Sequence, residues 1–191
     1  MSYVWWMALV VALACFVIGG EASGSAIVSR GQDGSVRIDD HTLRCGSVHH
    51  VLDSRLPNLG LAVPRKRLLV INPQLLGLQP KPVRLFVFHH ECGHHHVGAS
   101  ELDADCWAVR RGVLDGWLDR SGLAHVCASF GGAPATPIYP SAAHRCRNVV
   151  RCFANAEAEN AAAPSSAISD VRRPQELLGS TAPPPSNGQA P

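Results

Sequence analysis

The apolar positions divide the chain into a few segments of distinct character. An uncharged apolar run covers residues 4–20. The β-rich run KRLLVIN, residues 66–72, ends at Pro73 and predicts a strand. From Val83 the continuous apolar stretch VRLFVFHHECGHHH is long enough for a buried helix that begins beside Pro82. These patterns predict a single α+β domain that is mostly helical.

Residues that typically end or cap helices predict two more helices downstream. Gly98 interrupts the first helix, and Ser100 opens the next with Asp103 in the place of the usual Glu of a capping box. This second helix is predicted over residues 101–122. Residues 141–153 predict a last short helix, which follows a Pro-rich loop.

The same patterns predict the domain limits. Residues 23–40 are polar, and the folded domain is expected over 41–153. The Ala/Pro/Ser-rich segment 154–191 has no aromatic residue, so we expect a disordered tail that cannot bury enough surface to order itself.

The amino terminus is typical of a secretory signal peptide over residues 1–22. Small residues, Gly20 and Ala22, surround a cleavage point after the apolar run. No Lys or Arg precedes that run, so an uncleaved N-terminal anchor is the alternative. Either reading predicts an exported protein, periplasmic or secreted, with no stable membrane embedding unless the segment stays uncleaved.

Cysteine usage agrees with export. Beyond Cys15 the chain has six cysteines, an even number that predicts disulfides in an exported small domain, with buried free thiols as the alternative. A bridge between Cys92 and Cys106 would join neighbouring helices. Cys127 would then pair with Cys146 or Cys152.

Charge argues against two classes of partner. The net charge is +2, and charged residues make up 17% of the chain against about 25% in typical soluble domains. No cluster of Arg resembles a nucleic-acid patch, so we expect no nucleic-acid partner and no strong attraction to anionic membranes. The sequence does not predict an oligomeric state.

The motif HECGH carries the chemistry. On a helix, His90 and His94 share one face, so both imidazoles can reach a single zinc ion. Glu91 lies beside that face, where it can accept a proton from a metal-bound water molecule. The alternative is a His-rich helix in a core.

A catalytic zinc needs a third protein ligand, and Glu101 is the candidate. In a continuous helix Glu101 would lie about 10 Å farther along the axis than His94, so the chain must turn, and Gly98 can adopt a left-handed turn. Asp105, four residues after Glu101, can accept the remaining N–H of a ligand histidine. The rival assignment makes Asp105 the ligand and Glu101 a capping residue.

The motif HECGH followed by ELDAD resembles the HExxH…ExxAD signature of gluzincin metallopeptidases, and in particular the family that contains the HtpX heat-shock protease and the CaaX prenyl protease. That family also carries a His-Pro pair followed five residues later by Arg. Here Tyr139 and Pro140 are followed by Arg145, so Tyr139 replaces the histidine. The resemblance covers residues 58–153 and implies a minimal zincin-like domain with a short edge strand, an active-site helix and a glutamate helix.

The resemblance and the residue chemistry together imply a zinc metalloendopeptidase acting on peptide or protein substrates. His90, His94 and Glu101 would hold Zn²⁺, and Glu91 would act as general base on a zinc-activated water and return the proton to the leaving amine. Tyr139, His144 and Arg145 are the candidate donors to the developing oxyanion. The strand around residues 68–71 would pair with extended substrate backbone.

Two other functions fit the same residues. One is a non-catalytic zinc-binding module for binding or assembly, although a purely structural zinc site needs four ligands and no base. The other is a metal-buffering protein built on the flanking histidines His89, His95 and His96. That function would require several weakly bound metal ions and no dependence on Glu101.

Overall fold

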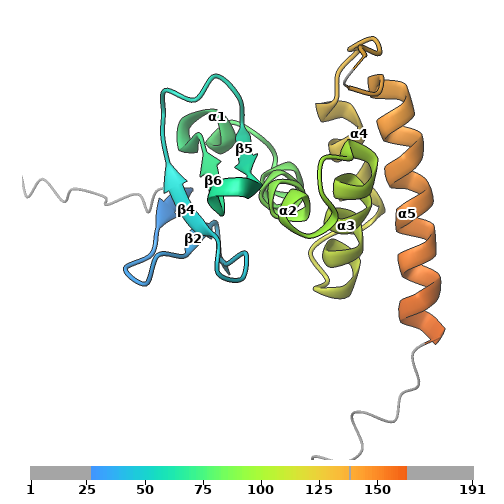
Figure 1. The fold of residues 1–191 in the computed structure, drawn as a ribbon. Helices are drawn as coiled ribbons and strands as arrows, with labels where there is room; N and C mark the ends of the chain where they lie inside the picture. The colour runs from blue at the N-terminus through green and yellow to red at the C-terminus, as the bar shows by residue number, and fades with distance from the viewer. Residues whose placement is uncertain (1–26, 138, 163–191) are drawn as a thin grey trace, which may run out of the picture.

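The computed structural model describes residues 27–137 and 139–162. These form an α+β fold with two small sheets, and about half of the described residues are helical. Helix α2 (Lys81–Val97) lies between the sheets on one side and the remaining long helices on the other (Figure 1). The predicted signal segment, residues 1–22, lies outside the described residues.

The first sheet is an antiparallel meander of three strands, β1 (Val28–Arg30), β2 (Val36–Ile38) and β3 (His41–Leu43), in the order β1-β2-β3. Val36 and Ile38 are 0% exposed. The prediction that the folded domain begins at residue 41 is therefore wrong. A three-residue alternation inside a polar segment is too short a signal to separate a strand from a loop.

The second sheet contains the predicted strand, but in a different position. Strand β6 (Leu68–Ile71) pairs in parallel with β4 (His49–Leu52) and antiparallel with β5 (Gly60–Val63), in the order β4-β6-β5. The prediction that residues 66–72 form an edge strand is wrong, because both edges of β6 are paired. The prediction that this strand would pair with substrate is wrong for the same reason.

Each α-helix begins after a recognisable stop or cap. The short α1 (Pro73–Gly77) is capped by Asn72, whose side chain accepts from Gln74 N and Leu75 N. The predicted helix over 101–122 is two helices, α3 (Glu101–Leu114) and α4 (Arg120–Ser129). Gly116 breaks the run with φ 75°, and the Asp119 side chain caps α4 by accepting from Gly122 N at 2.7 Å.

The last helix, α5 (Ala142–Ala162), is longer than predicted. Residues 154–162 continue the helix, so the prediction of disorder from 154 onward is wrong for this stretch. Ala156 is 2% exposed, and Glu157 pairs with Arg120 at 2.5 Å. The low-complexity composition of this stretch gave no sign that α5 packs against its neighbours there. Residues 163–191 lie outside the described part.

Three disulfides connect the elements. Cys45–Cys92 ties α2 to the loop before β4, Cys106–Cys152 ties α3 to α5, and Cys127–Cys146 ties α4 to α5. The predicted bridge between Cys92 and Cys106 is wrong, whereas Cys127–Cys146 is one of the two predicted pairings. The three bonds indicate an oxidising environment.

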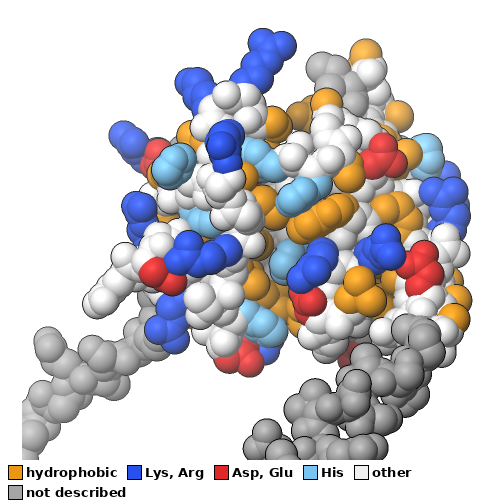
Figure 2. All heavy atoms as spheres, turned by 60° about the horizontal axis from the view of Figure 1, so that its bottom comes forward, with side chains coloured by type: hydrophobic (Ala, Val, Ile, Leu, Met, Phe, Trp, Pro, Cys, Tyr) orange, Lys and Arg blue, Asp and Glu red, His pale blue; other side chains and the backbone are white. Residues whose placement is uncertain are grey.

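Helix α2 contributes to two apolar cores. Phe88 and Cys92 pack in the cluster that includes Leu69 and Ile71 of β6, whereas Phe86 packs with residues of α3, α4 and α5 such as Val149. Among the described helices, none is both long and apolar enough to cross a membrane. On the face drawn in Figure 2, basic side chains are scattered among acidic and apolar ones.

Candidate metal centre

The two motif histidines lie on the face of α2 that meets α3. The helix begins directly after Pro80, with a second proline in its first turn, and continues without interruption through the motif. His90 and His94 are therefore one turn apart, with ring centroids separated by 4.7 Å. Their Nε2 atoms lie 3.2 Å from each other.

The turn predicted at Gly98 is present and brings the third residue to this face. Gly98 has φ 84°, a backbone conformation that favours glycine, and ends α2. The Ser100 hydroxyl caps α3 by accepting from Asp103 N, so Glu101 is the first residue of the new helix. Gly93 allows the two helices to approach, since a Cβ there would lie 3.1 Å from Ala104 O.

Three side chains, those of His90, His94 and Glu101 (the triad), then converge at the spacing of metal ligands. His90 Nε2 lies 3.3 Å from Glu101 Oε2, and His94 Nε2 lies 3.6 Å from Glu101 Oε1. Zinc bonds of about 2.0–2.1 Å in a tetrahedral arrangement separate neighbouring ligand atoms by about 3.3 Å. The separations of 3.2 Å between the two nitrogens and 3.3 Å between His90 Nε2 and Glu101 Oε2 match this value, and the other carboxylate oxygen lies 3.6 Å from His94 Nε2.

The opposite nitrogen of each imidazole contacts an acceptor. His94 Nδ1 lies 2.8 Å from the Gly98 carbonyl oxygen, and His90 Nδ1 lies 2.9 Å from Asp105 Oδ1. These contacts are satisfied when each ring carries its proton on Nδ1, which leaves both Nε2 lone pairs free to bind a metal. Asp105 thus lies behind His90, while Glu101 occupies the ligand position that the rival assignment gave to Asp105.

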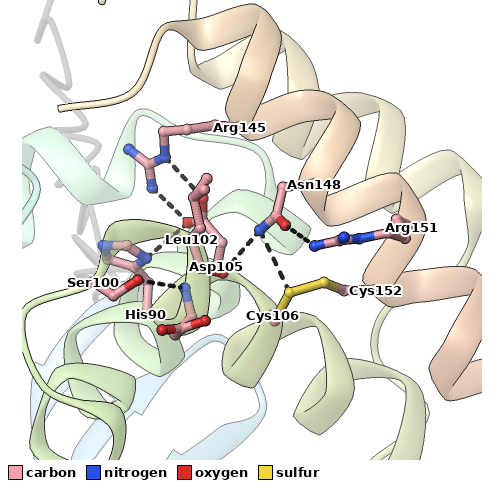
Figure 3. Close-up of a disulfide and its surroundings, with 10 residues drawn as sticks. His90, Ser100, Leu102, Asp105, Cys106, Arg145, Asn148, Arg151 and Cys152 are labelled. Atoms are coloured by element: carbon pink, nitrogen blue, oxygen red, sulfur yellow. Dashed lines mark hydrogen bonds and ion pairs between the residues drawn. A yellow bond between two sulfur atoms is a disulfide. The ribbon is translucent and has the colours of Figure 1, made fainter. Parts of the chain in front are cut away.

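Asp105 is completely buried and paired with Arg145 of α5 (Figure 3). Arg145 Nε and Nη2 donate to its two carboxylate oxygens at 2.8 and 2.5 Å, and Nη2 lies 3.7 Å from Glu101 Oε2. The guanidinium also stacks over Phe130, 4.4 Å from the ring centroid. Arg145 therefore contacts two carboxylates, that of Asp105 behind His90 and that of Glu101 in the triad.

Charges in this cluster shift one another's pKa. Burial alone would lower the pKa of His90, but the contacts with Asp105 and Glu101 outweigh it and raise the pKa to about 9. Burial acts on Glu101 in the opposite sense, yet His90, Arg145 and His94 hold the pKa of that carboxyl below its usual value. Without a metal, the cluster therefore holds a proton on His90 at neutral pH.

Glu91 of α2 lies beside the triad, and its side chain points toward β5. Its side chain passes over Gly60, where an added Cβ would lie 2.7 Å from Glu91 Cγ. Burial raises the pKa of the Glu91 carboxyl, while His90, His94 and the Ala62 backbone oppose that change. The contact of Gly60 and Ala62 with Glu91 could not be predicted from the sequence, because nothing local in the segment GLAV indicates a pairing with β6 and a contact with α2.

The three predicted oxyanion donors lie in different surroundings. Arg145 joins the cluster as described above. Tyr139 is 54% exposed and hydrogen-bonds Thr136 through its backbone, and His144 is exposed with its backbone N–H donating to Ser141 Oγ. Among the contacts of the described residues, none joins either side chain to the triad.

The other three histidines of α2 contact different groups. His89 stacks on Trp117 and His96 on Trp107, with centroid distances of 5.3 and 4.9 Å. His95 Nε2 lies 3.2 Å from the Leu68 carbonyl oxygen. A second group of metal-ligand atoms comprises Cys45, Cys92 and His96. Its two sulfurs are joined in a disulfide and are not thiolate ligands while that bond is intact.

Comparison with protein-family models, with curated proteins and with solved structures finds no match for the chain.

Proposed function

We propose that this protein is an exported zinc metallopeptidase with a gluzincin-like site in a minimal zincin-like domain. The observation that carries the proposal is the convergence of His90 Nε2, His94 Nε2 and Glu101 at separations that fit tetrahedral zinc. The set of three ligands, with a carboxylic acid beside it, is typical of catalytic zinc rather than of four-ligand structural zinc.

The outer contacts support this assignment. Asp105 and the Gly98 carbonyl fix the orientation of the two imidazoles, and Arg145 balances the negative charge of Asp105 and Glu101. In this arrangement Arg145 acts through the carboxylates that it contacts. Tyr139 and His144 stay the proposed donors to the developing oxyanion.

When bound, zinc supplies Lewis acidity and lowers the pKa of a water molecule at its open position. Glu91, which lies beside the triad, would accept the proton of that water and pass it to the leaving amine. The raised pKa of its carboxyl suits this double task, because a general acid–base group works best when its pKa lies close to the working pH.

The edge of β5 that pairs with no other strand is the proposed site for extended substrate backbone. β5 is an edge strand, and its residues Gly60 and Ala62 lie on the side that carries Glu91. A peptide that adds to this edge passes directly by the general base and the triad. This assignment replaces the one made for residues 68–71.

The substitution Glu91→Gln tests the catalytic part of the proposal. The amide keeps the size of the side chain but removes the base, so hydrolysis of a mixed peptide library should fall by at least about 100-fold. Zinc should stay at one ion per chain. The products are identified by mass spectrometry on the oxidised, zinc-loaded protein.

Two results would count against the metallopeptidase. Equal hydrolysis by the wild type and Glu91→Gln would mean that Glu91 is not the base. One tightly bound zinc ion without hydrolysis of any library peptide would instead support the non-catalytic binding module.

A further inference from the structure

Gly60 occupies a position where backbone conformation does not require glycine. It is the first residue of β5 and pairs with Ile71 of β6, without a positive φ. Glycine in a strand costs conformational entropy and leaves no side chain to pack. A glycine retained in such a place often marks the close approach of another group.

That group is the side chain of Glu91. A Cβ built on Gly60 would lie 2.7 Å from Glu91 Cγ, 3.2 Å from its Cδ and 3.1 Å from its Oε1. Carbon atoms do not pack closer than about 3.5 Å without repulsion. The three nearest neighbours of this Cβ all belong to one side chain, so Glu91 is the group that approaches Gly60 most closely.

The strand is the rigid partner in this contact. Register fixes β5 against β6 from Gly60↔Ile71 to Val63↔Leu68, and Asn72 N donates to the Leu59 carbonyl just before the strand. Leu69 and Ile71, on the same side of the sheet, are 0% exposed. A methyl group at position 60 would therefore move the Glu91 side chain and leave β5 in place.

We propose that Gly60 is a positioning residue for Glu91: its missing side chain makes room for the carboxylic acid beside the metal triad. The inference rests on the proposed function, since it assigns Gly60 a part in placing the general base. It also ties catalysis to β5, the strand proposed to bind substrate.

The substitution Gly60→Ala should separate turnover from binding. We expect kcat to fall about 10- to 100-fold, because a displacement of about 1 Å at a catalytic group has this effect. The zinc content should change little, because the nearest neighbours of an added Cβ are atoms of Glu91 and not of the three metal ligands. The KM should change less than kcat, because β5 stays in place. Gly77→Ala is the matched control, because a Cβ there meets no atom within 4 Å.

A double-mutant cycle tests the contact without zinc or substrate. Gly60→Ala, Glu91→Ala and the double variant are unfolded in urea as metal-free, disulfide-intact proteins. Gly60→Ala should lower the unfolding midpoint in the wild-type background. It should have little effect in the Glu91→Ala background, where the clashing atoms are absent.

Equal losses in both backgrounds would overturn the inference, because Gly60 would then be needed for a reason unrelated to Glu91. A kcat of Gly60→Ala equal to that of Gly77→Ala would also overturn it. Failure of the proposed function would look different: the wild type would bind no zinc or hydrolyse nothing, while the unfolding cycle would still report whether Gly60 places Glu91.

Discussion

Histidines on two faces of helix α2 have opposite pKa shifts and different contacts. The face toward α3 carries the proposed metal ligands and is called the metal face. There His90 Nδ1 lies 2.9 Å from Asp105 Oδ1, His94 Nδ1 lies 2.8 Å from the Gly98 carbonyl oxygen, and both Nε2 atoms face Glu101. On the other face, His89 is buried against Trp117, and neither of its ring nitrogens has a hydrogen-bond partner. Burial lowers the pKa of His89 to about 4, whereas nearby carboxylates raise that of His90 to about 9.

Neighbouring residues with the same side chain thus differ in charge at neutral pH because of their contacts. The metal face offers carboxylates and a carbonyl, which favour proton transfer and metal binding. The aromatic face offers rings, which favour a neutral histidine that acts as a flat apolar group. A count of histidines in this helix therefore says little about how many metal ions it binds.

The sharpest test of this difference removes one histidine from each face. His94→Ala should weaken zinc binding more than about 100-fold, because one ligand carries a large share of a total of about 10 kcal/mol. His96→Ala, which removes an exposed ring stacked on Trp107, should leave zinc affinity unchanged. Competition with a chromogenic chelator measures both affinities. Equal loss of zinc affinity in the two variants would show that the two faces do not differ in zinc binding.

Asp105→Asn sharpens the account of the metal face. The amide no longer provides a charged acceptor for His90 Nδ1 and leaves Arg145 without its main partner. Zinc affinity should fall about 10- to 100-fold, the usual cost of losing such an outer contact. Asp103→Asn is the control, because Asp103 is exposed on the same helix. Similar affinities for the two variants would show that Asp105 does not orient the ligand.

The raised pKa of His90 predicts the pH dependence of zinc binding. Zinc must displace the His90 proton, so the apparent affinity should rise about tenfold per pH unit between pH 7 and 9 and level off above the pKa of about 9. Chelator competition at a series of pH values measures the slope. A flat profile over this range would mean that His90 is already neutral in the metal-free protein.

Stability on the aromatic face should depend on pH. Since the pKa of His89 is about 4 in the folded protein against 6.5 as reference, the unfolded chain binds the proton first. Its contribution to stability is therefore present above pH 6.5 and is lost as the pH falls toward 4. In metal-free His89→Phe, the urea midpoint should fall less between pH 6.5 and 4 than in the wild type. An equal fall would show that His89 is not held neutral.

Local rules were enough to predict the arrangement of the metal face. Helical spacing paired His90 with His94, and bond lengths together with the single turn at Gly98 brought Glu101 back to them. Position i+4 placed Asp105 on the same face as Glu101. Each of these inferences involves residues within about 15 positions of one another, where backbone geometry fixes the outcome.

The features that could not be predicted from the sequence depend on contacts between distant segments. The pairing of β6 with β4, the contact of Gly60 with Glu91 and the partner of Cys92 join segments from 19 to 47 residues apart. No local sequence pattern specifies such pairings. Arg145 is a similar case, because its pairing with Asp105 depends on how α5 packs against α3. Helix α5 extends to Ala162 because packing and ion pairs outweigh its simple composition.

The zinc content of the oxidised protein tests the central claim most directly. Wild type and Glu101→Ala are purified, equilibrated with excess zinc, passed through a desalting column and measured by elemental analysis. The account predicts one tightly held zinc ion per chain in the wild type, with loss or strong weakening in Glu101→Ala. Several loosely held ions that do not depend on Glu101, or no zinc at all, would contradict the three-ligand site.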